Sequence, residues 1–387
     1  MFHKLNRIAI KLYSGCNMNC SYCFQHNNEK YNPQQFSYFS NLLKFLRTLD
    51  FEERVIVTFC GGELTLKPEL IEQCENEVFK KIERERDVKF EYAIITNGTN
   101  IEVMFDLFDK RILNYNFCNV SWDGLYSSSL SRYINGKFND EYFKEMIKKI
   151  GNSEYNNLSV VHALTPSTIE YLSDSFKFMI DNGLTSFGYY PIHEANYTED
   201  FCKKFEKELE KIYQYISGKD LNFFNIEMMN CEQNEYYFTC TKLGHNYYIN
   251  TSGDIYPCIY FGDHNAYLLG NIKNGLDEDA KNRFINDYLQ YPDCDYENCK
   301  CKFCGECNAA CYVNNGNMNK KFKNLCEIRK IEQRLYDKYK DNLILFDSYN
   351  DEDVNKNHLK LQFKKCDIEP LVNMVKQPHF ETLRNWK

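Results

Sequence analysis

The chain of 387 residues lacks the segments that direct proteins out of the cell or into a membrane. Residues 1–15 contain no apolar core of about 7–15 residues behind a basic start, so the sequence does not open with a secretory signal. No stretch approaches the ~20 consecutive apolar residues that a membrane-spanning helix requires. We therefore expect a cytoplasmic protein that does not bind membranes.

An excess of positive charge is also missing. The formal net charge is −8 and the pI is about 5.6, which argues against a general nucleic-acid binder and against a polybasic membrane binder. Internal repeats and low-complexity linkers are absent as well. Small molecules or peptides are the partners that this composition favours.

Cysteine, by contrast, is abundant. The chain has 18 cysteines, and in a reducing compartment such a number indicates metal binding rather than disulfides. Ten of them fall between positions 231 and 326. This uneven distribution predicts a boundary near residue 230, and the length favours two or three domains.

The first 230 residues alternate between strand and helix patterns. Alternation of this kind predicts βαβ units and a parallel sheet, and six strands fit an open partial (β/α)6 barrel, TIM-like, better than a closed eight-stranded one. The predicted strands are 7–13, 54–60, 88–95, 113–121, 157–164 and 185–190. The predicted helices are 32–49, 67–84, 101–109, 139–150, 167–182 and 198–217.

Three cysteines, Cys16, Cys20 and Cys23, lie within eight residues directly after the first predicted strand. Three thiolates can bind three irons of a [4Fe–4S] cube, which normally takes four ligands, so one iron stays open. A zinc site would need a second cysteine pair or a histidine pair nearby, and the next cysteine is Cys60. Incidental buried thiols or half of a disulfide framework are the structural alternatives.

This Cys-x3-Cys-x-aromatic-Cys loop resembles the cluster loop of the radical S-adenosylmethionine (SAM) superfamily. The resemblance implies that Cys16, Cys20 and Cys23 hold a [4Fe–4S] cluster and that Tyr22 lies against the cofactor. It also implies an oxidoreductase in which SAM binds the open iron and is reductively cleaved to a 5′-deoxyadenosyl radical.

Polar groups follow the next strands, where ligands of parallel α/β folds bind. Gly61 and Gly62 allow close approach of the backbone, and Glu63 can accept hydrogen bonds from an ammonium group; the segment resembles the GGE motif that binds the SAM amino group. Asn97, after the third strand, is placed for a ribose hydroxyl or is a turn-forming Asn-Gly. Ser121, after the fourth, resembles the family serine that faces the SAM carboxylate or ribose.

Asp123 in the same segment is equally well explained as a turn cap. The family often has an arginine after this point, and Arg132 is the nearest candidate. Val161 and His162 lie on the fifth strand, where the family flanks adenine, but a core valine and a structural histidine are the favoured interpretation.

The cysteine-rich region resembles the SPASM domain, an extension that holds two auxiliary [4Fe–4S] clusters. The resemblance assigns Cys240, Cys258 and Cys311 to the first auxiliary cluster and Cys301, Cys304, Cys307 and Cys326 to the second. The spacing departs from the family pattern between Cys301 and Cys307. A fourth ligand of the first cluster is open: Cys231, Cys294, Cys299 or none. From the residues alone, a ferredoxin-type run and a zinc ribbon remain alternatives.

These patterns predict three parts: a radical SAM partial barrel over 1–225, a SPASM auxiliary-cluster domain over 226–330, and a C-terminal extension over 331–387. The extension contains a helical stretch at 331–339. Its role, peptide recognition or capping of the last domain, is left open.

The resemblance implies modification of a ribosomally made precursor peptide by a thioether or carbon–carbon crosslink. In sulfatase-maturing relatives an aspartate follows the Gly-x4-Cys cysteine, and here that position is Ile259, which argues against that activity. We also expect a reductant such as flavodoxin or ferredoxin and a leader-binding module on a separate protein, if there is one. A radical SAM dehydrogenase acting on a small molecule and a non-catalytic iron–sulfur carrier or sensor are the alternatives.

Overall fold

The structure is a computed structural model that describes residues 4–23, 25, 37–113, 118–134, 139–156, 158–223, 246–289, 307–318 and 323–343. All of these belong to one compact unit, Lys4–Phe346. In the part of the chain so described, no helix is long and apolar enough to cross a membrane.

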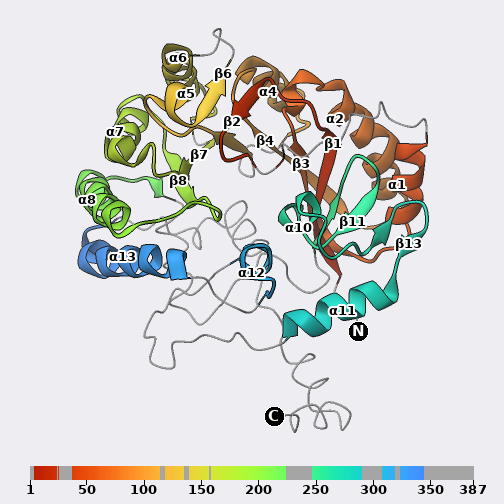
Figure 1. Cartoon of the computed structure of the whole chain (residues 1–387). Helices are drawn as coiled ribbons and strands as arrows, with labels where there is room; N and C mark the ends of the chain where they lie inside the picture. Colours follow the sequence, from red (N-terminus) through yellow and green to blue (C-terminus); the bar gives the residue numbers. More distant parts are fainter. Residues whose placement is uncertain are drawn as a thin grey trace, which may run out of the picture. The chain divides into compact units, whose positions relative to one another are not determined.

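One sheet organises the unit, and six of its strands are neighbours that run parallel in the order β1-β3-β4-β5-β7-β8. These are the six predicted strands, so the predicted α/β class with an open parallel barrel is confirmed. Figure 1 shows them as successive strands from red to green. Their bounds are β1 Leu5–Tyr13, β3 Phe51–Gly61, β4 Lys89–Thr96, β5 Asn119–Ser121, β7 Ser159–Leu164 and β8 Ser186–Pro191.

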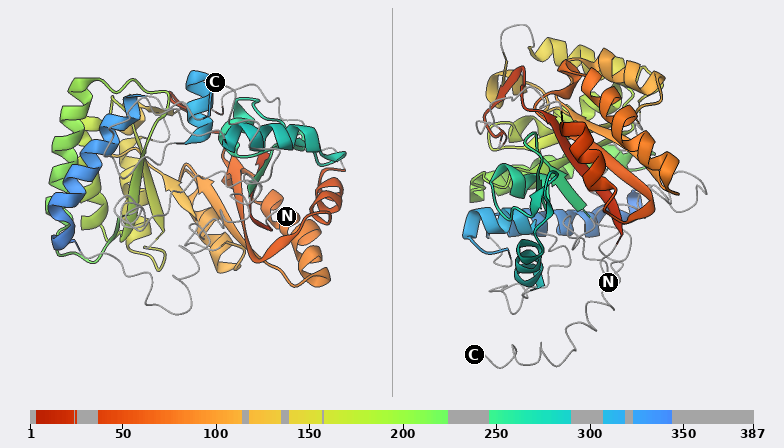
Figure 2. Two further views of the ribbon diagram at one scale, coloured as in Figure 1. Left: turned by 90° about the horizontal axis from the view of Figure 1, so that it is seen from below. Right: turned by 90° about the vertical axis from the view of Figure 1, so that its right-hand side faces the viewer.

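Helices connect these strands and cover the outer face of the sheet (Figure 2). The helix predicted over 67–84 is divided by a π turn, and the predicted helix over 32–49 is described only from residue 38. The bounds are α1 Tyr38–Leu46, η2 Leu64–Leu66, α2 Glu69–Cys74, η3 Glu75–Phe79, α3 Lys80–Glu85, α4 Ile101–Asp109, α5 Ser127–Leu130, α6 Asp140–Gly151, η5 Ile169–Tyr171, α7 Leu172–Asp181 and α8 Glu199–Ile216.

The core lies between the sheet and these helices because side chains alternate across a strand. On β3, Val57 and Phe59 are fully buried, and Phe59 stacks on Tyr92 of β4 with ring centroids 6.0 Å apart. Tyr92 in turn contacts Phe79 of η3 at 5.7 Å. The opposite face of the strands therefore forms the inner wall of the barrel.

The sheet continues beyond the six predicted strands. β10 (Asn246–Ile249) pairs with β1 in parallel, with Ile8 opposite Tyr247, and the antiparallel strands β11, β12 and β13 follow it. These strands have two to four residues each, too few for an alternating pattern to stand out in the sequence. The cysteine-rich region is therefore continuous with the barrel sheet. Remaining strands are β2 Met18–Cys20, β6 Arg132–Ile134, β9 Asn222–Phe223, β11 Asp254–Tyr256, β12 Gly270–Asn271 and β13 Gly275–Leu276.

The helices of the second half are α10 Ile259–Asp263, α11 Glu278–Leu289, α12 Asn308–Asn315, α13 Lys323–Tyr339 and η6 Lys340–Asn342. Rings of Phe261, Tyr267, Phe284 and Tyr312 pack together with centroids 4.9–6.0 Å apart and join α10, α11 and α12. α13 runs beside α8 on the outer side of the barrel (Figures 1 and 2). It begins earlier than the predicted helix at 331–339.

Candidate metal and cofactor site

The cysteine loop begins directly after β1 and is held by a small sheet of its own. β2, which contains Cys20, pairs antiparallel with β6, and Cys20 lies opposite Arg132. The Ser21 amide donates to the Ser131 carbonyl at 2.8 Å, and the Cys23 amide donates to the Cys20 carbonyl at 3.1 Å. The loop conformation is therefore set by a segment more than a hundred residues further along the chain.

The three thiols lie within electrostatic range of one another. Burial raises the pKa of Cys20 to about 11; Arg132 opposes this shift, while Cys23 and Cys16 add to it. Burial likewise raises the pKa of Cys16 and of Cys23. Cys16 is nevertheless exposed, Cys20 and Cys23 are half-buried, and none of the three forms a disulfide. This environment differs from that of core thiols such as Cys74, which is fully buried.

Among the residues described, no three His, Cys, Asp or Glu side chains converge closely enough to hold a single metal ion. A [4Fe–4S] cube makes a different demand, because each of its thiolate ligands binds a different iron. Three half-exposed thiols on one short loop fit that demand. The donor set therefore suits a cluster and does not form a single-ion centre.

Gly61, Gly62 and Glu63 run alongside the cysteine loop. The Gly62 amide donates to the Tyr13 carbonyl at 3.0 Å, and the Glu63 amide donates to the Gly15 carbonyl at 2.8 Å. A Cβ on Gly62 would lie 2.0 Å from the Gly15 carbonyl oxygen, and Gly61 has φ +127°. Both positions need glycine, and the motif is brought against the start of the cysteine loop.

The Glu63 carboxylate is fully buried and accepts four hydrogen bonds, two from η2 and two from the end of β4. Its Oε1 accepts from the Thr65 amide at 3.1 Å, the Thr65 hydroxyl at 2.6 Å and the Thr96 hydroxyl at 2.8 Å. Its Oε2 accepts from the Asn97 amide at 2.6 Å. The side chain thus fixes the neighbouring strand ends, and its predicted contact with the SAM amino group stays a prediction.

Asn97 connects Glu63 to the cysteine loop. Its side-chain amide donates to Asn17 Oδ1 at 2.9 Å and lies 3.6 Å from Cys16 Sγ. Its side-chain oxygen accepts from the Thr99 amide at 2.9 Å, and Gly98 has φ +78°. The turn interpretation and the site interpretation therefore both apply, since an Asn-Gly turn places this amide beside the loop.

Arg132 and Asp123 form a buried ion pair behind the loop, with Nη1 3.3 Å from Oδ1 and both side chains almost inaccessible. Arg132 also donates to the Tyr22 hydroxyl at 3.2 Å, while Asp123 accepts from the Ser131 hydroxyl at 2.9 Å. Asp123 is therefore the partner of Arg132, a role that the turn-cap interpretation missed. The Arg132 Nε has no hydrogen-bond partner among the residues that the structure describes.

The inner face of β5, β7 and β8 is open. Ser121 lies opposite Val161 in the parallel register, and both are half-buried. Tyr190, two strands away, is 39% exposed, and its hydroxyl interacts electrostatically with Asp123, Arg132 and the cysteine loop. Nothing in the sequence marked Tyr190. His162 points outward, is fully buried and lies beside Phe176 with centroids 6.1 Å apart, as a structural histidine would.

Four of the predicted auxiliary ligands are described, and they come from three separate elements. Cys258 precedes α10, Cys307 precedes α12, and Cys311 and Cys326 lie on α12 and α13. Cys258 and Cys307 both interact electrostatically with the Tyr260 hydroxyl, and α10 contacts α12. The predicted ligands Cys240, Cys301 and Cys304 lie outside the described residues, as do Cys231, Cys294 and Cys299.

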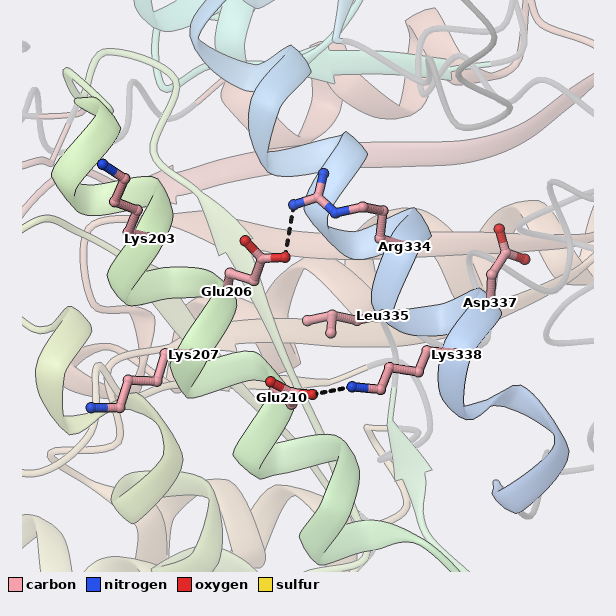
Figure 3. A pocket seen from close by; sticks show the side chains of 8 residues that line it. All are labelled: Lys203, Glu206, Lys207, Glu210, Arg334, Leu335, Asp337 and Lys338. Atoms are coloured by element: carbon pink, nitrogen blue, oxygen red, sulfur yellow. Dashed lines mark hydrogen bonds and ion pairs between the residues drawn. The ribbon is translucent and has the colours of Figure 1, made fainter.

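A groove of about 640 Å³ lies elsewhere, between α8 and α13. Figure 3 shows the charged side chains that line it, with ion pairs from Arg334 to Glu206 and from Lys338 to Glu210. It is on the outer side of the barrel, away from the strand ends that carry the cysteines and Glu63. The groove is therefore separate from the residues gathered at the strand ends.

The arrangement of these residues agrees with the sequence profile of the radical SAM superfamily, which matches residues 10–179. Residues 10–179 are a radical SAM domain, and the chain is a radical SAM enzyme. This domain implies a [4Fe–4S] cluster and SAM as cofactors. An uncharacterised protein of Methanocaldococcus jannaschii is 26% identical over 262 residues, which span 67% of this radical SAM chain and 86% of the relative.

Solved structures share the fold. Native anSMEcpe with bound AdoMet and the Kp18Cys peptide superposes with a TM-score of 0.67 at 18% identity, covering 87% of this chain and 99% of that one. SuiB of Streptococcus suis bound to its precursor peptide SuiA gives a TM-score of 0.54 at 16% identity, covering 84% and 76%. Identities this low establish the radical SAM fold alone.

Proposed function

We propose that this enzyme cleaves SAM reductively and uses the resulting radical to crosslink a ribosomally made peptide. The observation that carries the proposal is the convergence of the cysteine loop, Glu63, Asn97 and Arg132 at the carboxyl ends of β1, β3 and β4 and beside β5, above a half-exposed inner wall. Parallel barrels bind their ligands at these strand ends. Cys16, Cys20 and Cys23 would hold the cluster, which would supply the electron for reductive cleavage of SAM.

The chain's own residues hold and shield the cofactor. Gly61 and Gly62 keep the backbone at the start of the cysteine loop free of side chains, and Tyr22 would contact the cofactor from within the loop. Ser121 on β5 is on the inner wall for a ribose or carboxylate oxygen. Arg132 is a buried guanidinium 3.2 Å from the Tyr22 hydroxyl, which suits a carboxylate.

A peptide substrate is supported by the fold's known complexes and by the open inner face. The anSMEcpe and SuiB structures include complexes with peptides, and an extended strand can lie along an inner wall of this shape. A thioether or carbon–carbon bond removes two hydrogens from the peptide. One would leave as a hydrogen atom to form 5′-deoxyadenosine and the other as a proton, and an oxidised auxiliary cluster held by the cysteine-rich region would supply the acceptor for the remaining electron.

We assign two auxiliary clusters to the cysteine-rich region, following the SPASM pattern. Cys258 and Cys307 precede α10 and α12, two helices in contact with each other, and both interact electrostatically with the Tyr260 hydroxyl, which supports a shared iron–sulfur region. Cys240, Cys301 and Cys304 complete the proposed ligand set. A separate protein such as flavodoxin or ferredoxin would deliver the first electron.

Anaerobic reconstitution followed by incubation with SAM and dithionite tests the first step. We expect 5′-deoxyadenosine from the wild type and from a Cys202→Ser variant, because Cys202 lies on α8 outside the site. Iron should approach ~12 per chain, the sum for three four-iron clusters. A fully reconstituted protein that forms no 5′-deoxyadenosine would contradict the radical activity, and iron near ~4 would contradict the auxiliary clusters.

The substrate class needs a separate measurement. Synthetic peptides encoded beside the gene are incubated with enzyme, SAM and reductant, and their masses are compared before and after. A loss of two hydrogen atoms that requires SAM supports crosslinking. Formation of 5′-deoxyadenosine that increases with a small alcohol and with no such peptide would favour the dehydrogenase alternative.

A further inference from the structure

The short helix α10, which starts directly after Cys258, is bound to β1 by a buried ion pair. Lys11 Nζ lies 3.3 Å from Asp263 Oδ1, and the two side chains are 2% and 5% exposed. The Tyr248 hydroxyl lies 3.5 Å from the same carboxylate oxygen. A lysine within the apolar run of β1 is the sequence signal that marks this contact.

The other side of α10 reaches the loop after β8 through four side chains, His193, Glu194, Tyr260 and His264, which we call the rim cluster. The Tyr260 hydroxyl donates to Glu194, and His264 Nε2 lies 3.7 Å from the same carboxylate. The ring of Tyr260 contacts His193 at 5.5 Å and His264 at 4.7 Å between centroids. α10 therefore bridges from β1 to the end of β8, across the six parallel strands.

The two sides differ in burial. In the rim cluster Tyr260 is 7% exposed, but the side chains of Glu194 and His264 are 39% and 24% exposed. Water therefore screens the attraction between Glu194 and His264 and competes for the hydrogen bonds of Glu194. Separating Lys11 from Asp263 would instead leave a charge uncompensated in a closed environment. Any displacement of α10 therefore breaks the rim cluster first and leaves the ion pair intact.

The loop that carries Glu194 is fixed to the barrel. The buried Tyr197 donates its hydroxyl to the carbonyls of Leu164 and Ile192, both at 2.9 Å. On the other side, Phe261 is fully buried among rings of α11 and α12. α10 packs on β10 and β11 on its β1 side, where a Cβ on Gly262 would lie 2.3 Å from the Tyr248 ring. A displacement of α10 would therefore turn about this packed side and leave the loop after β8 in place.

Some side chains on the inner wall of the barrel, behind the rim cluster, are exposed. Tyr190 on β8 and Ile95 on β4 are each 39% exposed. Tyr189 packs outward against Phe205, with centroids 5.6 Å apart, so Tyr190 points inward because neighbours on a strand alternate. Tyr190 therefore faces inward on the strand that ends at the rim cluster, and it interacts electrostatically with Cys20 and Cys23 of the cysteine loop.

We propose that α10 and the helices packed on it form a movable wall that pivots at Lys11–Asp263 and opens at the rim cluster to admit an extended peptide. Glu194 is the positioning residue that keeps this side closed. That the molecule admitted is a peptide substrate rests on the proposed function. The opening itself is a property of the protein alone and can be measured without SAM or peptide.

Two measurements on the full-length protein test the wall. Glu194→Gln and Tyr260→Phe should each speed amide hydrogen exchange over residues 259–266 by about fivefold, the factor expected for losing one exposed contact. Hydroxyl-radical footprinting should show faster oxidation of the Tyr190 side chain in the same variants. Glu170→Gln, which removes an exposed ion pair with Lys204 on α8, is the matched control and should change neither reading.

The Lys11→Met variant tests the proposed pivot independently of the rim cluster. It should raise exchange in β1 as well as α10 and lower the melting temperature, whereas the Glu194 and Tyr260 variants should leave β1 unchanged. Unaltered exchange over 259–266 in both rim variants overturns the wall, and faster exchange without faster Tyr190 oxidation overturns the opening toward Tyr190. Failure of the wild type to form 5′-deoxyadenosine would instead contradict the proposed function and leave these readings untouched.

Discussion

The cysteine loop and the cysteine-rich region hold their thiols in opposite ways. Cys16, Cys20 and Cys23 are neighbours in sequence, and distant segments at the ends of β3, β4 and β6 fix the loop around them. Cys258, Cys307, Cys311 and Cys326 are distant in sequence, and each is placed by its own helix or helix start. The first site depends on hydrogen bonds to a loop, and the second depends on the packing of helices. Substitutions in the two regions should therefore have different effects on iron content, SAM cleavage and stability.

Removing thiols gives the largest expected difference. A triple variant, Cys16→Ala, Cys20→Ala and Cys23→Ala, should form no 5′-deoxyadenosine and lose ~4 of ~12 irons, the content of one cube. Cys326→Ala should lose a similar amount of iron yet keep SAM cleavage, because its helix is anchored independently. Iron analysis and product chromatography check both. Loss of SAM cleavage in the Cys326 variant would mean that the two regions are not separable.

Arg132→Gln should produce the next largest effect, in the first region alone. The substitution leaves Asp123 as an unpaired buried charge, which costs about 3–5 kcal/mol, and it removes the guanidinium beside Tyr22. We expect a lower melting temperature and weaker SAM binding by calorimetry. The exposed Arg84→Gln on α3 is the control.

A double variant, Arg132→Gln with Asp123→Asn, should recover part of that stability because no lone charge remains. Coupling between the two substitutions can be read from a double-mutant cycle. Additive losses would show that the pair is not the source of the effect.

The stability of the barrel should depend on pH because of His162. Burial lowers its pKa from 6.5 to about 4, against the opposing influence of Asp123. The unfolded chain therefore binds a proton that the folded chain rejects, so stability present above pH 6.5 is lost as the pH falls toward 4. Near pH 5 this amounts to about 2 kcal/mol.

His162→Leu should remove this dependence. The fall in melting temperature between about pH 7.5 and pH 5 should be smaller in the variant than in the wild type. An equal fall in both proteins would show that other groups control the acid response.

The smallest effect concerns the helix that carries Cys326. Tyr189 of β8 donates to the fully buried Glu332 of α13 at 2.8 Å, and Arg329 contacts the same carboxylate at 2.7 Å. Tyr189→Phe should cost about 1.5 kcal/mol, since a hydrogen bond to a buried charge is lost. Tyr339, which is on α13, donates to the more exposed Glu210 at 3.0 Å, and Tyr339→Phe should cost about 0.5 kcal/mol. Thermal melts of both variants compare the two losses of stability, and equal losses would contradict the role of burial.

The same contrast explains what the sequence could predict. The six parallel strands, their helices and the cysteine loop follow from local patterns, because alternation and ligand spacing are visible over a few residues. The pairing of Arg132 with Asp123, the contact of Lys11 with Asp263 and the inward position of Tyr190 depend on tertiary packing. Glu63 falls between these cases: its motif marked the position, but its four hydrogen bonds from η2 and the end of β4 are visible only in the folded chain.

The pairing of β2 with β6 has a consequence for how the protein is made. Tyr22 and Arg132 are 110 residues apart, and ribosomes extend chains by about 5–20 residues per second. The cysteine loop therefore leaves the ribosome roughly ten seconds before the strand that holds it exists. During that interval the three thiols belong to an unpaired nascent segment, open to whichever iron–sulfur donor or oxidant reaches them first.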